Sequence, residues 1–172
     1  MTKFDESSRC SGGRRVYFRW YGFPTCAVGG DLEAATEAFF IALAAPDRVW
    51  SPHSKAMAKM EFQRRLQKAE LGKLRPVTDV KPIDVDNPPP LYEIRWQTIA
   101  VTTRTDGVLN HRSTIVRLYH SEPASHPAHF IGHHVHEKVL ATDHIYRAQD
   151  EEIQISKRFF DAGVPSSWGI AT

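Results

Sequence analysis

The sequence predicts an α+β domain in which two N-terminal helices pack on an antiparallel sheet, in the order β-α-α-β-β-β, followed by a C-terminal helix. The chain has 172 residues, of which 41% are hydrophobic and 24% charged, and this composition is typical of one globular domain. Apolar residues recur at helical spacing between residues 31 and 71 and with a period of two between residues 91 and 138. These three observations together predict the architecture.

The N-terminal third contains one strand and two helices. Residues 1–14 are polar and aperiodic, so we expect a flexible tail ahead of a single domain over residues 15–172. The aromatic-rich stretch 15–21 predicts a strand. A helix should begin with Asp31 as its N-cap and stop before Pro46. The next should begin at Ser51, followed by proline in the first turn, and end at Gly72.

The second half is a predicted strand meander. After the proline-rich stretch 82–90, strands are expected over residues 91–99, 111–120 and 129–138. A turn at Asp106-Gly107 separates the first two, and Thr142-Asp143 should cap the last helix. With the apolar side of the sheet packed on the two N-terminal helices, we expect the opposite face to be open to solvent.

Alternation along these strands assigns a set of polar side chains to the open face, with Glu93 nearby. The candidate catalytic residues on it are Arg95, Arg117, Tyr119, His134, His136 and Lys138. Such a set suits cleavage of RNA by its own 2′-hydroxyl, which needs a base, an acid and fixed cations around phosphorus. Histidine titrates near neutral pH, and arginine matches phosphate oxygens. We therefore expect no metal and no cofactor.

The second helix is basic on one face, although the formal net charge of the chain is only +2. The residues that we expect to bind RNA phosphates through it are Lys55, Lys59, Arg64, Arg65, Lys68 and Lys73.

Several short motifs occur in a fixed order along the chain. The first motif is Lys81-Pro82-Ile83, which leads into Leu91-Tyr92-Glu93-Ile94-Arg95. The second covers residues 131–138, where an apolar residue and a glycine precede two histidines and an apolar residue, and the stretch ends at Lys138. Together with Leu71-Gly72 and Thr142-Asp143, these motifs make residues 15–162 resemble the RelE/ParE toxin superfamily, in particular its HigB-like, phage-derived branch. The resemblance implies a RelE-like fold. It also matches Arg95 and Lys138 to motif positions of the family, and puts Arg117 and Tyr119 on the strand that usually carries a catalytic arginine.

By this resemblance, the chain is expected to be the toxin of a type II toxin–antitoxin system and to inhibit growth. The implied activity is that of a ribosome-dependent mRNA interferase, a metal-independent endoribonuclease and hydrolase. Its implied partners are a cognate antitoxin, mRNA and the ribosome, with no membrane. Two cysteines form no disulfide framework and no secretory signal is visible, so we expect a cytoplasmic protein.

Three alternatives remain open. The first is a ParE-like inhibitor of DNA gyrase on the same fold. The second is a zinc protein, because seven of the nine histidines fall between His111 and His136. Its ligands would be His134 and His136 with His120, His126, His129 or His133. The third is a non-catalytic binding module descended from such a toxin.

Overall fold

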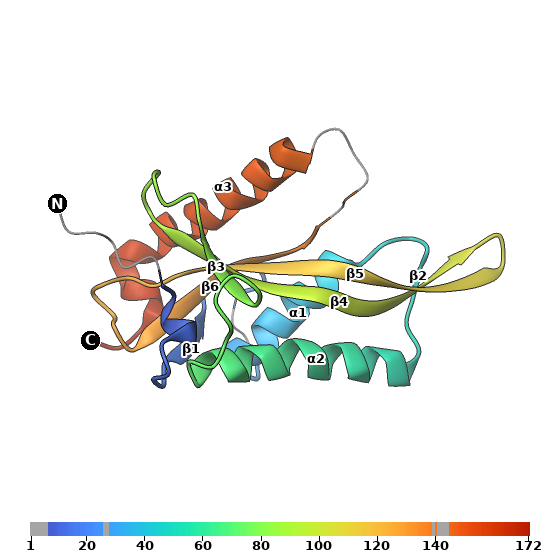
Figure 1. Cartoon of the computed structure of the whole chain (residues 1–172), viewed down its shortest axis with the longest axis horizontal. Coiled ribbons are helices and arrows are strands. Elements are labelled where there is room, and N and C mark those ends of the chain that lie inside the picture. The colour runs from blue at the N-terminus through green and yellow to red at the C-terminus, as the bar shows by residue number, and fades with distance from the viewer. Residues whose placement is uncertain (1–6, 26–27, 139, 141–144) are drawn as a thin grey trace.

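The computed structural model describes residues 7–25, 28–138, 140 and 145–172 (Figure 1). A six-stranded sheet runs in the order β1-β6-β5-β4-β2, and β3 also pairs with β4. The strands are β1 Tyr17–Trp20, β2 Arg48–Val49, β3 Val80–Ile83, β4 Leu91–Thr105, β5 Val108–Ser121 and β6 His129–Lys138. The helices are α1 Asp31–Leu43, α2 Pro52–Glu70 and α3 Ile145–Gly163, with 3-10 helices η1 Arg9–Ser11 and η2 Val164–Gly169.

The predicted fold class, two N-terminal helices on an antiparallel RelE-like sheet, is wrong. The sheet is mixed, because β1 runs parallel to β6. It also contains two short strands that the sequence did not predict, β2 and β3, both antiparallel to β4. Strands of two to four residues are too short to show a period of two. In β3, Pro82 is compatible with pairing because this strand has β4 as its one described neighbour.

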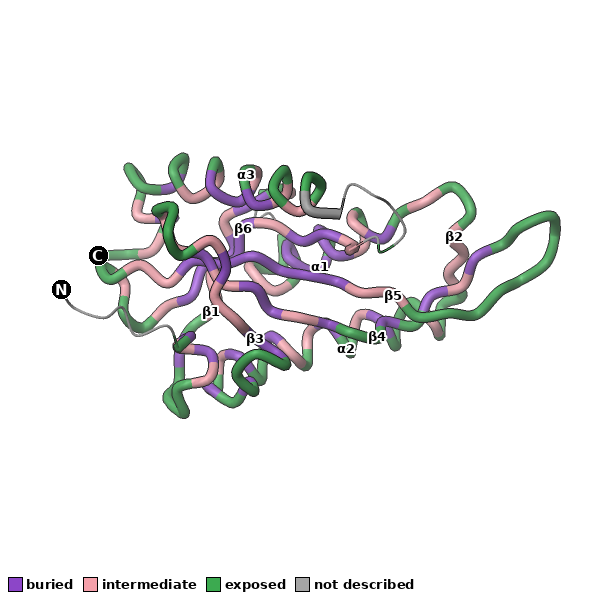
Figure 2. Tube along the Cα trace, turned by 45° about the horizontal axis from the view of Figure 1, so that its top comes forward, coloured by how far each residue is buried: buried purple, intermediate pink, exposed green. Residues whose placement is uncertain are grey.

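Both faces of the sheet are covered by helices, contrary to the expected open face. Figure 1 shows α1 and α2 on one side and α3 on the other. The core beneath α1 and α2 is built on stacked aromatic rings, with Phe62 between Phe39 (centroids 4.5 Å apart) and Trp96 (4.8 Å). On the other face, Ile153 of α3 packs with Tyr119, Ile83 and Leu91 in a smaller apolar cluster. Figure 2 shows that β4 and β5 are buried in the middle of the molecule and exposed at the end of their hairpin.

The ends of α2 follow the sequence signals. The hydroxyl of Ser51 accepts a hydrogen bond from the Ser54 amide in a capping box, and Gly72 adopts φ +65° just after the helix. The cap of α1 differs, because Gly30 takes the N-cap position. The carboxylate of Asp31 instead accepts a hydrogen bond from the backbone amide of Trp20 at 3.0 Å. The predicted cap of the last helix, at residues 142–143, lies outside the described residues.

Residues 7–14, within the stretch expected to be a tail, pack on the domain. Cys10 in η1 is fully buried, and its carbonyl oxygen accepts a hydrogen bond from the Leu74 amide at 2.9 Å. In the part of the chain that the structure describes, no helix combines the length and the apolar character needed to cross a bilayer.

Candidate functional site

The strand register brings polar side chains of four strands into two adjacent rows on the α3 face of the sheet. The first row runs Lys81, Glu93, Tyr119 and His134, and the second runs Arg95, Arg117 and His136. Residues two apart on one strand lie on the same face, so the two rows form one continuous patch. The patch contains five of the six predicted catalytic residues, and Lys138 of β6 comes two residues after His136.

Glu93 is at the centre of this patch. Its Oε1 lies 3.5 Å from Nζ of Lys81 and 3.3 Å from Nε of Arg95, while its Oε2 lies 3.7 Å from Nε of Arg117. Arg95 and Arg117 are directly opposite on neighbouring strands, an arrangement that is destabilising unless an anion lies between them. The buried carboxylate of Glu93 is this anion.

The patch carries an excess of positive charge. Burial lowers the pKa of Arg117, while the charge of Glu93 opposes this change. Burial and the charge of Arg117 lower the pKa of Lys138, and Arg95 and Lys81 act in the same direction. Four cations around one carboxylate leave a net charge of +3, so the patch favours an additional anion.

Two histidines with different surroundings border the cations. Burial lowers the pKa of His136 to about 4, so its ring is neutral at pH 7. Its Nε2 has no hydrogen-bond partner among the described residues. His134 has a ring that stacks on that of His136, with centroids 6.0 Å apart, and it donates a hydrogen bond through Nε2 to the carboxylate of Glu152 on α3. Although burial opposes it, this bond holds the pKa of Glu152 below its usual value.

The expectation that all these side chains face open solvent is wrong, because α3 covers part of the patch. Arg117 is 2% exposed, Tyr119 1% and His136 9%. Burial and the charge of Glu93 also raise the pKa of Tyr119 well above its usual value, so its phenol stays protonated. The side chains of Arg95 and His134 remain 20% and 22% exposed and form the accessible rim.

A pocket of about 470 Å³ opens between α1 and α3 beside the two histidines. His134, His136 and Glu152 contribute to its wall. The rest of the lining is largely apolar and includes Phe23 and Phe159. A planar apolar group can therefore be held next to the imidazole rings.

Half of the predicted RNA-binding residues, which lie on α2 and just after it, have ion-pair partners within the protein. Lys59 pairs with Glu33 at 3.1 Å, whereas Arg65 and Lys68 lie 3.5 and 3.9 Å from the buried carboxylate of Asp79. The other three are Lys55, whose ammonium group lies over the ring of Phe40, and Arg64 and Lys73, which form no ion pair within the described ranges. Because α2 is on the opposite side of the sheet from α3, this helix and the charged patch do not form one surface (Figure 1).

Three residues of this site were not among the predicted site residues: Glu93, which was expected only to lie nearby, Lys81 and Glu152. Lys81 occurs in a motif, but the strand that aligns it with Glu93 was too short to predict. Glu152 gave no signal, because nothing in the periodicity of α3 tells which strand the helix packs on.

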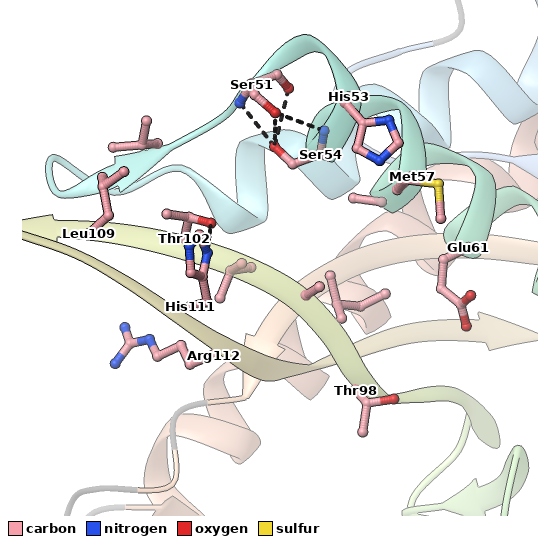
Figure 3. Close-up of a pocket in the computed structure, with 15 residues that line it drawn as sticks. Ser51, His53, Ser54, Met57, Glu61, Thr98, Thr102, Leu109, His111 and Arg112 are labelled. Atoms are coloured by element: carbon pink, nitrogen blue, oxygen red, sulfur yellow. Dashed lines mark hydrogen bonds between the residues drawn. The ribbon is translucent and has the colours of Figure 1, made fainter.

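A second pocket, of about 560 Å³, lies between the N-terminus of α2 and the β4–β5 hairpin (Figure 3). Two pairs of its polar side chains are bonded to each other, Ser51 to Ser54 and Thr102 Oγ1 to His111 Nδ1 at 3.0 Å. No acid–base pair meets a group of cations there, so the charged patch is the stronger candidate site.

The zinc alternative based on His134 and His136 gains no support from the geometry. Among the described residues, only one group of three potential metal ligands has its ligand atoms close together, and it consists of Cys10, His120 and Glu122.

Comparisons of the chain with protein-family models, with curated proteins and with solved structures each give no match. The function must therefore be inferred from the residues and their geometry.

Proposed function

We propose that this protein is an endoribonuclease that cleaves RNA without a catalytic metal, and that it acts as the toxin of a toxin–antitoxin pair. One observation supports the catalytic part of this proposal. Three cations contact Glu93, and a fourth, Lys138, interacts electrostatically with the group. These cations lie directly beside a neutral histidine and a histidine–carboxylate pair. Fixed cations next to an acid and a base are what phosphodiester cleavage requires.

In the proposed reaction, the scissile phosphate binds to the more exposed cations of the patch, Arg95, Lys81 and Lys138. Nε2 of His136 accepts the proton of the 2′-hydroxyl, whose oxygen attacks phosphorus. The bond from phosphorus to the 5′-oxygen breaks, and His134, oriented by its hydrogen bond to Glu152, donates a proton to the leaving oxygen. The products are a 2′,3′-cyclic phosphate and a 5′-hydroxyl.

Arg117 has a different role in this scheme. It is buried, and its Nε is without a hydrogen-bond partner among the described residues. A fixed guanidinium at low dielectric stabilises negative charge that grows on the phosphoryl oxygens in the transition state. The apolar pocket beside His134 and His136 would hold the base next to the scissile bond.

The test is cleavage of an end-labelled RNA by the purified protein, with and without ribosomes, in buffer without added divalent ions. We expect products ending in a 2′,3′-cyclic phosphate, and no cleavage where the attacking nucleotide is replaced by its 2′-deoxy form. His136→Gln should lower the rate by about two to four orders of magnitude, the usual contribution of a general base. Arg95→Gln should also lower it strongly.

The matched control is Arg104→Gln, which removes an exposed arginine from the same strand as Arg95 and should leave the rate unchanged. A full rate in His136→Gln, or cleavage of the 2′-deoxy RNA, would contradict the mechanism.

The toxin role, the antitoxin and the ribosome come from the resemblance, and a separate experiment tests them. Induction of the chain alone in bacterial cells should arrest growth and produce new 5′ ends in cellular mRNA. Growth arrest without new 5′ ends, combined with stalled supercoiling by purified gyrase, would instead support the gyrase inhibitor.

A further inference from the structure

Three potential metal ligands from distant parts of the sequence meet beneath η1. Cys10 comes from η1, His120 from the end of β5, and Glu122 from the residue just after that strand. The Nε2 atom of His120 lies 3.8 Å from Sγ of Cys10 and 3.0 Å from Oε1 of Glu122. All three ligand atoms lie within 4.8 Å of one another. One atom placed among them can therefore contact all three.

The spacing of these atoms fits a tetrahedral zinc ion. Zinc bond lengths of about 2.3 Å to sulfur and about 2.0 Å to nitrogen and oxygen imply ligand separations of roughly 3.6 Å for sulfur–nitrogen and roughly 3.3 Å for nitrogen–oxygen. The observed separations of 3.8 and 3.0 Å are close to both values. Small side-chain movements would thus be enough to bind the ion.

The charges of the group also suit a divalent cation. Cys10 and His120 are both fully buried. With zinc bound, a thiolate of Cys10 and the carboxylate of Glu122 would together neutralise the two charges of the ion. The guanidinium of Arg9 lies 4.0 Å from Oε2 of Glu122, the oxygen that the metal does not use.

Outer contacts orient the carboxylate. The backbone amide of Arg9 donates to Oε2 of Glu122 at 2.8 Å, which leaves Oε1 directed toward His120. The hydroxyl of Ser8 donates to the same Oε1 at 2.5 Å and provides a further oxygen near the three ligands. Such outer contacts are typical of metal sites.

We propose that Sγ of Cys10, Nε2 of His120 and Oε1 of Glu122 bind one Zn²⁺ ion, which links η1 to the end of β5. The role of this ion is structural. It is separate from RNA cleavage, because none of its ligands belongs to the charged patch. This site differs from the zinc site considered from the sequence, which used His134 and His136.

The test is metal analysis of full-length protein produced without a histidine tag in zinc-containing medium. We expect about one zinc per chain, and almost none in Cys10→Ala and Glu122→Gln. Cys26→Ala and His126→Ala, which remove the other cysteine and a nearby histidine, should retain the metal. Circular dichroism spectra will show whether each variant folds.

A second measurement does not depend on variants. Wild-type protein stripped by a chelator and titrated with Co²⁺ should develop a near-ultraviolet thiolate-to-cobalt absorption band that saturates at one equivalent, and its melting temperature should rise. Wild-type protein that contains no zinc and gives no thiolate band with Co²⁺ would overturn the proposal.

Discussion

His133 shows how the environment of a single residue sets its chemistry. Its Nδ1 lies 3.0 Å from the carbonyl oxygen of Tyr21, and its Nε2 lies 2.8 Å from the hydroxyl of Ser121. Because a carbonyl oxygen only accepts, Nδ1 carries the proton and Nε2 accepts from Ser121. Burial lowers the pKa of His133 to about 3, so the ring is neutral. The next residue, His134, reaches the partly exposed Glu152 instead.

This burial predicts a loss of stability in mild acid. An unfolded histidine has a pKa of about 6.5, so below that pH the unfolded chain takes up a proton that folded His133 does not bind until about pH 3. His136 acts in the same direction down to about pH 4. Each group should therefore lower the free energy of unfolding by up to about 1.4 kcal/mol per pH unit below 6.5. Urea denaturation at pH 7, 6 and 5 measures this slope.

The slope can be assigned by substitution. His133→Gln should reduce the slope of the free energy of unfolding between pH 6 and 5 by up to about 1.4 kcal/mol per pH unit, which corresponds to one proton. His53→Gln, which changes an exposed histidine on α2, should leave this slope unchanged. An identical slope in His133→Gln and wild type would show that His133 is not the buried neutral group.

Alternation along the strands predicted which side chains share the charged patch, because a period of two depends only on local backbone geometry. The alternation is interrupted at His133, where the register shifts. Tyr119 is opposite His134 but His120 is opposite Gly132, so β6 contains one extra residue. A bulge of this kind redirects a side chain without any signal in the hydrophobic pattern.

At the scale of elements, the features that could be predicted from the sequence are those set by interactions between residues close together in the chain. The ends of α2 could be predicted because the Ser51 cap and Gly72 act within one helical turn. The parallel pairing of β1 with β6 joins segments more than 100 residues apart in sequence, and no local pattern encodes it. The packing of α3 is equally non-local. Consequently the members of the site were largely predictable, and their burial was not.

The apolar contact of α3 with the sheet leads to a prediction. Ile153 is buried against Tyr119, Ile83 and Leu91, while Lys157 on the same helix bonds to Asp84 at 2.5 Å and to the carbonyl oxygen of Asn87 at 2.8 Å. Ile153→Ala should lower the free energy of unfolding by about 2–4 kcal/mol, the usual cost of a buried isoleucine-to-alanine change. Chemical denaturation at pH 7 measures it. The exposed neighbour Gln154→Ala should cost little, and equal stabilities of the two variants would mean that α3 does not depend on this contact.

At the scale of the whole molecule, the net charge of +2 is too small to attract RNA from a distance. The attraction must be local, and the two basic regions differ in how much charge is free. On α2, Lys59 pairs with Glu33, and Arg65 and Lys68 share Asp79. In the patch, Lys81, Arg95 and Arg117 all share the one carboxylate of Glu93, and the charge of Lys138 is added to theirs. We therefore expect the patch to dominate RNA binding.

This difference can be measured as a salt dependence, which depends on the proposed function. For single-stranded RNA, the slope of log affinity against log salt concentration is about −0.7 per neutralised phosphate, so three contacts at the patch predict about −2. Removal of one contact by Lys81→Ala should make the slope shallower by about 0.7. Lys59→Ala should hardly change it, because this similarly exposed lysine is paired with Glu33. Binding of an RNA made cleavage-resistant by 2′-O-methylation, measured at 50–200 mM salt, provides the slopes. A larger effect of Lys59→Ala than of Lys81→Ala would show that RNA binds to α2 and not to the patch.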